Sequence, residues 1–290
     1  MKQPLFSVLI ANYNNGKYLM EAIESVRQQT YTHWEIVLVD DASTDNSHEL
    51  YNDLEKDERI HICYNERNMG CGYTKRRCAE LAQGEICGFL DPDDALLPRA
   101  LYVSMQALVS HPQAVLTFSR FYYCDENLNV LHENRLLHLN GGESYYEHLD
   151  YSPEHFASFK KEAYFKTSGI DQTLQAAVDQ DLYFKLEEIG QIVCLNELTY
   201  KYRLNTNGIS QGKNENWAFY WNTIVRHNVC LRRKLPIERF SFEKFCEYMT
   251  IMRNLAVEES RLESEDRIRK TKTYKLGYYL LLPFKRIFRS

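Results

Sequence analysis

The sequence predicts an α/β protein with a mostly parallel central sheet flanked by helices. Short apolar runs of strand length alternate with segments whose apolar residues recur at helical spacing. This alternation is typical of parallel strands joined by right-handed helical crossovers. Two of the apolar runs end in carboxylates, at residues 40–41 and 91–94. Because open α/β sheets bind their ligands at the carboxyl edge, we expect a site there.

The first part of the chain carries the parallel pattern. Apolar runs are expected to form buried strands at residues 6–10, 34–39, 60–64 and 86–90. Helices are expected between them. The first is indicated by the spacing of Leu19, Ile23 and Val26, the second by capping residues at 43–45, and the third covers residues 74–82.

After residue 94 the alternation stops. A helix leads into a long apolar run and a polar turn at 125–127, a pattern that favours an antiparallel excursion over another strand–helix–strand unit. The remaining elements are expected as helices at 98–110 and 179–189 and as strands at 115–123, 156–160, 193–195 and 198–203. From Trp217 onward the pattern is helical, with a break at Pro236.

Length and composition bound the class of protein. A chain of 290 residues with 26% charged content can form one generous domain plus an appendage. We expect an α/β domain over residues 1–212 and a helical C-terminal extension over 213–290. The net charge of -5 argues against nucleic acid as the main partner. Eight cysteines without a CxxC pair, and no signal peptide, predict reduced thiols in a cytoplasmic protein.

The carboxylates at the strand ends are the candidate site. Asp91, Asp93 and Asp94 follow a buried run within four residues, and hard oxygens of this kind suit Mg²⁺ or Mn²⁺. The alternative is a helix start, with Asp93 or Asp94 as the N-cap. The second acidic strand end, at Asp40 and Asp41, favours a site, because both pairs fall on the same edge of a parallel sheet.

A series of motifs resembles the family 2 glycosyltransferases of the GT-A fold. Each motif is weak alone, but they occur in the family's order over about the first 210 residues. They are FSVLIANYN at 6–14, VDDASTD at 39–45, NMG at 68–70, AQGE at 82–85, FLDPDD at 89–94, SGID at 168–171, DQDL at 179–182, YR at 202–203 and Ser210. The resemblance implies the GT-A fold and a metal-dependent, inverting transfer of sugar from a nucleotide-diphosphate donor, a UDP-sugar above all.

The resemblance also implies roles for individual residues. The sheet edge would hold the donor through Ala11, Asn12, Tyr13, Asp40, Asp41, Lys75, Asp91 and Pro92. Lys75 stands where the family usually has an arginine. Asp91 and Asp93 would bind Mn²⁺ or Mg²⁺, with Asp93 as the direct ligand. Asp179 matches the catalytic base, for which the alternative is the N-cap of its own helix.

The chain departs from the family pattern at a few positions. Val178 replaces a glutamate and Asn205 replaces a histidine that can approach the diphosphate or the metal; Arg76 and Cys78 also differ. These changes leave open a non-catalytic scaffold that binds nucleotides or glycans. A sugar nucleotidyltransferase is a second alternative, although no Gly-rich phosphate loop follows the first predicted strand.

The C-terminal tail interleaves aromatic and aliphatic residues with lysines and arginines. Residues 267–290 contain no Asp or Glu. A basic amphipathic segment of this kind favours peripheral contact with an anionic membrane, here the inner face of the cytoplasmic membrane. The alternative is a terminal helix packed on the catalytic domain. Membrane contact would suit a glycan or lipid-linked acceptor in surface polysaccharide biosynthesis.

Overall fold

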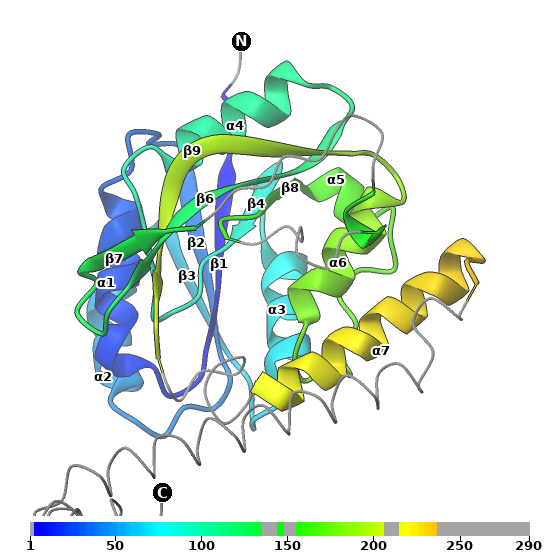
Figure 1. Cartoon of the computed structure of the whole chain (residues 1–290). Helices are drawn as coiled ribbons and strands as arrows, with labels where there is room; N and C mark the ends of the chain where they lie inside the picture. The colour runs from blue at the N-terminus through cyan, green and yellow to red at the C-terminus, as the bar shows by residue number, and fades with distance from the viewer. Residues whose placement is uncertain (1–2, 135–143, 148–154, 206–214, 237–290) are drawn as a thin grey trace, which may run out of the picture. The chain divides into compact units, whose positions relative to one another are not determined.

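The computed structural model describes residues 3–134, 144–147, 155–205 and 215–236 (Figure 1). Its strands are β1 Phe6–Asn12, β2 Trp34–Asp40, β3 Ile60–Tyr64, β4 Ile86–Phe89, β5 Ala95–Leu96, β6 Ala114–Cys124, β7 Val130–Glu133, β8 Ser158–Lys160 and β9 Gln191–Arg203. Its helices are α1 Gly16–Arg27, α2 Ser47–Leu54, α3 Cys71–Leu81, α4 Ala100–Ser110, α5 Lys161–Tyr164, α6 Val178–Glu187 and α7 Glu215–Arg233, with a 3₁₀ turn at Tyr145–Glu147.

The described strands form one sheet in the order β3-β2-β1-β4-β8-β6-β9-β5, with β7 paired to β6. The first four strands in this order are parallel, as the alternating pattern predicts. β8 then runs antiparallel to both β4 and β6, and β7 is antiparallel to β6. The predicted antiparallel excursion is therefore confirmed, and the sheet as a whole is mixed.

β9 differs from its prediction. The sequence predicts two short strands, whereas β9 is a single strand of 13 residues that pairs in parallel with β6 and antiparallel with β5. The β6–β9 register shifts between Ser119 and Phe121, opposite the polar stretch of β9 around Glu197. A bulge of this kind absorbs residues that break an apolar run, so the interruption in the pattern does not end the strand.

Helices cover both faces of the sheet. β1 is buried on both faces: Phe6, Val8 and Ile10 pack with Leu19 and Ile23 of α1 in one core, while α3 contacts β1 and β2 from the other side. Figure 1 shows α1 and α2 on one side of the sheet and α3 with α6 on the other. Because β1 is covered on both faces, the open ends of the strands are where a ligand can approach.

The chain divides into two compact units, Met1–Leu235 and Pro236–Ser290. α7 belongs to the first unit, where it packs against α6. The predicted boundary between residues 212 and 213 remains a prediction, and the basic tail lies outside the described residues. Within the described part of the chain, no helix is both long and apolar enough to cross a membrane.

Candidate active site

A cleft of about 1340 Å³ opens at the carboxyl ends of β1, β2 and β4. It is lined by the turn after β1, the start of α3, the acidic loop after β4, the start of α6 and two residues of α7. Of the residues predicted for the site, the cleft brings together Ala11, Asn12, Tyr13, Asp41, Lys75, Asp91, Pro92, Asp93 and Asp179. Only Asp40 among them does not line it.

Asp40 lies behind the lining of the cleft. It is fully buried, and its carboxylate accepts hydrogen bonds from the hydroxyl of Tyr51 at 2.5 Å, the amide of Asn12 at 3.3 Å and the backbone N–H of Ser43 at 2.9 Å. The expectation that Asp40 lies against the donor is therefore not met by this geometry. Instead, Asp40 holds the turn after β2 against the end of β1.

Asp41 reaches the cleft but is already engaged. One carboxylate oxygen accepts from the side chain of Asn65 at 2.7 Å and the N–H of Met69 at 2.8 Å, and the other accepts from the N–H of Gly70 at 2.9 Å. Gly70 has a φ of +88°, a conformation that favours glycine. Asp41 thus fixes the loop that precedes α3. Its Oδ2, which accepts only from Gly70 among the described residues, retains a lone pair for an N–H or O–H group of a ligand in the cleft.

The acidic loop after β4 is tied to β9. The carboxylate of Asp94 is buried and accepts from the hydroxyl of Tyr200 and from the N–H of Arg203, each at 2.7 Å. The interpretation of Asp93 or Asp94 as a helix N-cap is wrong: α4 starts at Ala100, and its N-cap residue is Arg99. The side chain of Asp94 instead joins the loop to the far strand of the sheet.

Arg203 completes this attachment. Its Nε donates to the carbonyl of Asp93 at 2.5 Å, and its guanidinium pairs with Glu21 of α1 at 2.8 Å while lying 4.2 Å from the ring of Tyr18. The backbone of Asp93 is thereby held while its carboxylate lines the cleft. The amide of Asn205 lies 3.4 Å from that carboxylate, so the departure from the family's histidine falls beside the predicted metal ligand.

Asp179 lies in the first turn of α6, and the N-cap position is taken by Ala177, which has a φ of +55°. The alternative of Asp179 as the N-cap is therefore not realised. Its Oδ2 accepts from the ammonium of Lys75 at 2.7 Å, and the same ammonium lies 3.1 Å from Oδ1 of Asp91. Oδ1 of Asp179 is buried and has no hydrogen-bond partner among the described residues.

His155 is a site residue that the sequence reasoning missed. One of its ring nitrogens lies within 4.8 Å of carboxylate oxygens of Asp91 and Asp94. Its ring stacks on Tyr200 and Tyr202 of β9, with centroids 4.8 and 4.5 Å away, which sets its orientation. No local pattern marks this histidine, because only the pairing of β8 with β4 brings it to the acidic loop.

Burial and neighbouring charges shift the pKa values of the titratable side chains in the cleft. Burial raises the pKa of Asp93, and the negative charge of Asp91 raises it further. Burial opposes ionisation of Asp91, but the ammonium of Lys75 outweighs it and lowers that pKa. Burial lowers the pKa of His155 despite the opposing charges of Asp91 and Asp179, which favours the neutral imidazole.

These residues fit a divalent cation. Among the described residues, the side chain of Asp93 makes one long contact, to the amide of Asn205. Burial disfavours the charge of this carboxylate, and a cation would relieve that cost. Carboxylate oxygens with one neutral imidazole nearby suit Mn²⁺ well and Mg²⁺ less well. Asp94 is the exception, because both of its oxygens already accept hydrogen bonds from β9.

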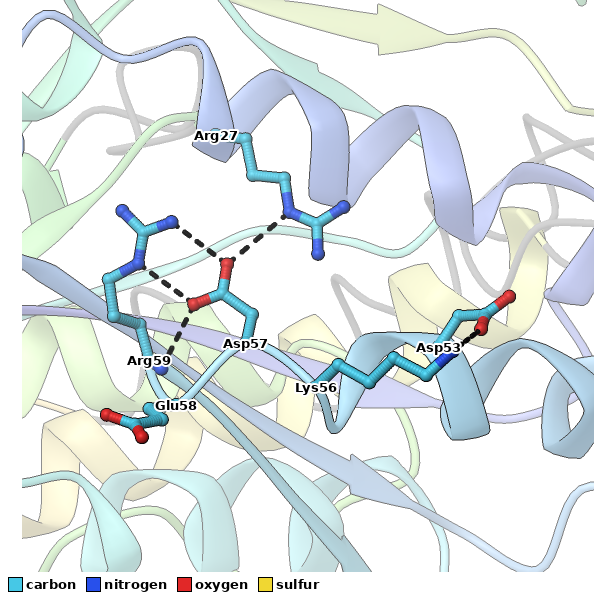
Figure 2. A pocket seen from close by; sticks show the side chains of 6 residues that line it. All are labelled: Arg27, Asp53, Lys56, Asp57, Glu58 and Arg59. Carbon is cyan, nitrogen blue, oxygen red and sulfur yellow. Dashed lines mark hydrogen bonds and ion pairs between the residues drawn. The ribbon is translucent and has the colours of Figure 1, made fainter.

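A second hollow, of about 620 Å³, lies on the surface near the amino ends of β2 and β3 (Figure 2). Asp57 pairs there with Arg59 at 2.9 Å and with Arg27 at 3.6 Å, and Lys56 pairs with Asp53. Because its charges largely pair with one another and it lies away from the carboxyl edge, it is not a second candidate for the chemistry.

Comparison with known sequences finds one family model, glycosyl transferase family 2, which matches residues 7–168. An uncharacterized glycosyltransferase of Methanocaldococcus jannaschii is 30% identical over 237 residues, which cover 78% of this chain and 80% of that protein. Chondroitin synthase of Escherichia coli is 29% identical over 68% of this chain, but the match spans only 28% of that longer enzyme.

Solved structures share the fold at low identity. S. aureus TarS in complex with UDP-GlcNAc superposes with a TM-score of 0.62 at 19% identity, over 76% of this chain and 65% of that one. A mannosyltransferase of Pyrobaculum calidifontis in complex with GDP-Man and Mn²⁺ gives 0.60 at 16% identity, over 96% and 84%.

Proposed function

The chain belongs to glycosyl transferase family 2, and we propose that it transfers a sugar from a nucleotide-diphosphate donor to an acceptor hydroxyl with inversion. It is a glycosyltransferase with the GT-A fold of its structural neighbours. One observation carries the proposal. The carboxylates of Asp91, Asp93 and Asp179, contributed by elements far apart in the sequence, line a single cleft at the carboxyl edge of the sheet.

The donor is proposed to be a UDP-sugar. Structural neighbours were solved with UDP-GlcNAc and with GDP-Man, which supports a nucleotide-sugar donor but leaves the base to experiment. Tyr13 is 44% exposed at the cleft, where its ring can cover a planar base. Asp41 lies beside it with a lone pair that can accept the imide N–H of uracil. Asp91 and Pro92 would lie toward the diphosphate, with Lys75 beside Asp91.

Asp179 is proposed as the general base. Its Oδ1 is the unpartnered oxygen, so it can take the proton of an acceptor hydroxyl while Oδ2 stays bound to Lys75. The hydroxyl oxygen then attacks the anomeric carbon and the nucleoside diphosphate leaves from the opposite face. Asp91 and Asp93 would hold Mn²⁺ or Mg²⁺, with His155 near Asp91. A bound cation supplies Lewis-acid stabilisation of the leaving diphosphate.

The acceptor is proposed to be a growing glycan or a lipid-linked sugar in polysaccharide biosynthesis. The similarity to chondroitin synthase supports this class, although the chain spans less than a third of that enzyme. We retain a cytoplasmic location at the inner face of the membrane as a proposal. The basic tail that motivates it lies outside the described residues.

The test is transfer or hydrolysis from a panel of nucleotide sugars in the presence of Mn²⁺. We expect one donor to be turned over, with Asp179→Asn lowering kcat by roughly 10² to 10⁴, the usual contribution of a general base. Asp93→Ala should lose turnover at ordinary Mn²⁺ concentrations. Asp53→Asn, an exposed carboxylate outside the cleft, is the control. If no donor binds with metal present, the transferase proposal fails; full turnover by Asp179→Asn would reassign the base.

A further inference from the structure

Lys75 lies between two carboxylates of the cleft with different proposed roles: Asp91, on the donor side, and Asp179, the proposed base. Lys75 extends from α3, and its ammonium lies 2.7 Å from Asp179 at the start of α6 and 3.1 Å from Asp91 at the end of β4. It is only 6% exposed. The ammonium therefore joins α3 and the end of β4, which are neighbours in the chain, to α6, which is distant from both in the sequence.

The chemistry of the side chain suits a bridge. An ammonium is a compact charge with three N–H donors, so it can serve two carboxylates at once. The two carboxylates at 2.7 and 3.1 Å favour the charged form of the side chain over the neutral amine. The ring of Phe89, 5.2 Å from Nζ, adds a further favourable contact.

We propose that Lys75 is a positioning residue that couples the donor-side carboxylate Asp91 to the base Asp179. By binding Oδ2 of Asp179, Lys75 keeps Oδ1 directed at the acceptor. Because Lys75 also contacts Asp91, the orientation of Asp179 depends on whether the donor site is occupied. If Asp91 held a cation, the ammonium of Lys75 would be repelled from it and would keep its pairing with Asp179. The inference rests on the proposed function only where it names Asp179 as the base.

An alternative role for Lys75 is direct binding of the donor nucleotide by its ammonium group. The two roles predict different defects. Such binding contributes equally to the ground state and the transition state, so its loss raises the KM for the donor and leaves kcat unchanged. A residue that orients the base contributes in the transition state, so its loss lowers kcat.

The first experiment needs no substrate. Thermal unfolding is measured for Lys75→Met, Asp179→Asn and the double variant, with Lys75→Arg as the variant that keeps the charge. We expect Lys75→Met to lower the melting temperature less than half as much in the Asp179→Asn background as in the wild type, because the bridge is already broken there. Equal effects in the two backgrounds would overturn the bridge.

The second experiment measures kinetics with the donor found by the panel. We expect Lys75→Met to lower kcat by about 10² with less than a threefold change in the KM for the donor, and Lys75→Arg to restore part of the rate. The double variant should be no slower than Asp179→Asn, because the two residues act as one unit. A raised KM with unchanged kcat would overturn the proposal and assign Lys75 to the nucleotide.

The matched control is Lys185→Met. Lys185 is also a buried lysine, 8% exposed, that pairs with a carboxylate, Asp181, but it lies on α6 outside the lining of the cleft. It should lose stability without a selective loss of kcat. If the wild type uses no donor, the proposed function fails, while the unfolding cycle still decides whether Lys75 and Asp179 are coupled.

Discussion

At the scale of single residues, neighbouring aspartates have separate tasks. Asp40 and Asp94 are buried and accept hydrogen bonds from their own protein, whereas Asp91 and Asp93 line the cleft. The local sequence does not distinguish them, because a carboxylate that supports a loop and one that faces a ligand are the same residue type. Their partners, Tyr51 and Tyr200, decide the difference.

Asp57 provides a prediction about pH at this scale. The hydrogen bond from the side chain of Arg59 lowers the pKa of Asp57 below its usual value (Figure 2). Because the folded pKa is below the unfolded one, the pair stabilises the fold above about pH 4 and this contribution disappears as pH falls through the folded pKa. Asp57→Asn should cost about 1 kcal/mol at pH 7 and progressively less below pH 4.

The measurement is urea unfolding of Asp57→Asn and wild type at pH 7 and near pH 3. Glu58→Gln is the control, because Glu58 lines the same hollow and Figure 2 draws no interaction to it. A difference between wild type and Asp57→Asn that is constant across this range would contradict the prediction.

At the scale of elements, α7 is fastened to α6, the helix that carries Asp179. Arg226 is buried, donates to the carbonyl of Tyr146 at 2.8 Å and lies 5.2 Å from the ring of Phe184. Ala218 and Asn222 of the same helix line the cleft. The position of α7 therefore determines where these two residues lie in the cleft.

Arg226→Met should reduce the free energy of unfolding by roughly 2 kcal/mol, because it leaves the Tyr146 carbonyl without this donor. For a domain of this size that corresponds to a loss of roughly 4–8 °C in melting temperature. Scanning calorimetry measures the shift. Arg99→Met, which removes an exposed arginine at the N-cap of α4 whose ion pair with Glu197 spans 3.6 Å, should change the melting temperature by less than about 2 °C. Equal shifts for the two variants would show that Arg226 does not fasten the helix.

At the scale of the whole molecule, the cleft joins the parallel half of the sheet to the mixed half. The parallel half supplies Tyr13, Asp41 and the acidic loop, and the elements that follow it supply His155 and Asp179. A ligand that spans both halves should therefore stabilise the entire fold rather than one loop.

UDP together with Mn²⁺ should raise the melting temperature by roughly 5–10 °C at concentrations about 100-fold above the dissociation constant, since such binding contributes about 2.7 kcal/mol. A chelator should reverse most of the shift, because Asp91 and Asp93 would hold the cation that the diphosphate requires. Thermal scans with and without chelator measure this, with ADP as the control nucleotide. A shift that a chelator leaves unchanged would show that nucleotide binding does not depend on the metal.

Much of this molecule follows from the sequence alone. The apolar runs predict β1 to β4 and their parallel orientation, because each run is short, continuous and followed by a helical pattern. The acidic strand ends predict the edge of the sheet where the cleft opens, because parallel strands bring their carboxyl ends together. The glycosyltransferase family follows from the order of the motifs, and the family model confirms it.

Other features were decided only by the tertiary structure. Whether Asp40 faces inward, whether Asp94 caps a helix or binds β9, and whether His155 reaches the acidic loop depend on contacts between residues far apart in the chain. The bridge from Lys75 to Asp91 and Asp179 is of the same kind. Local patterns report burial and secondary structure, whereas a site is made by long-range packing that brings distant side chains within a few ångströms.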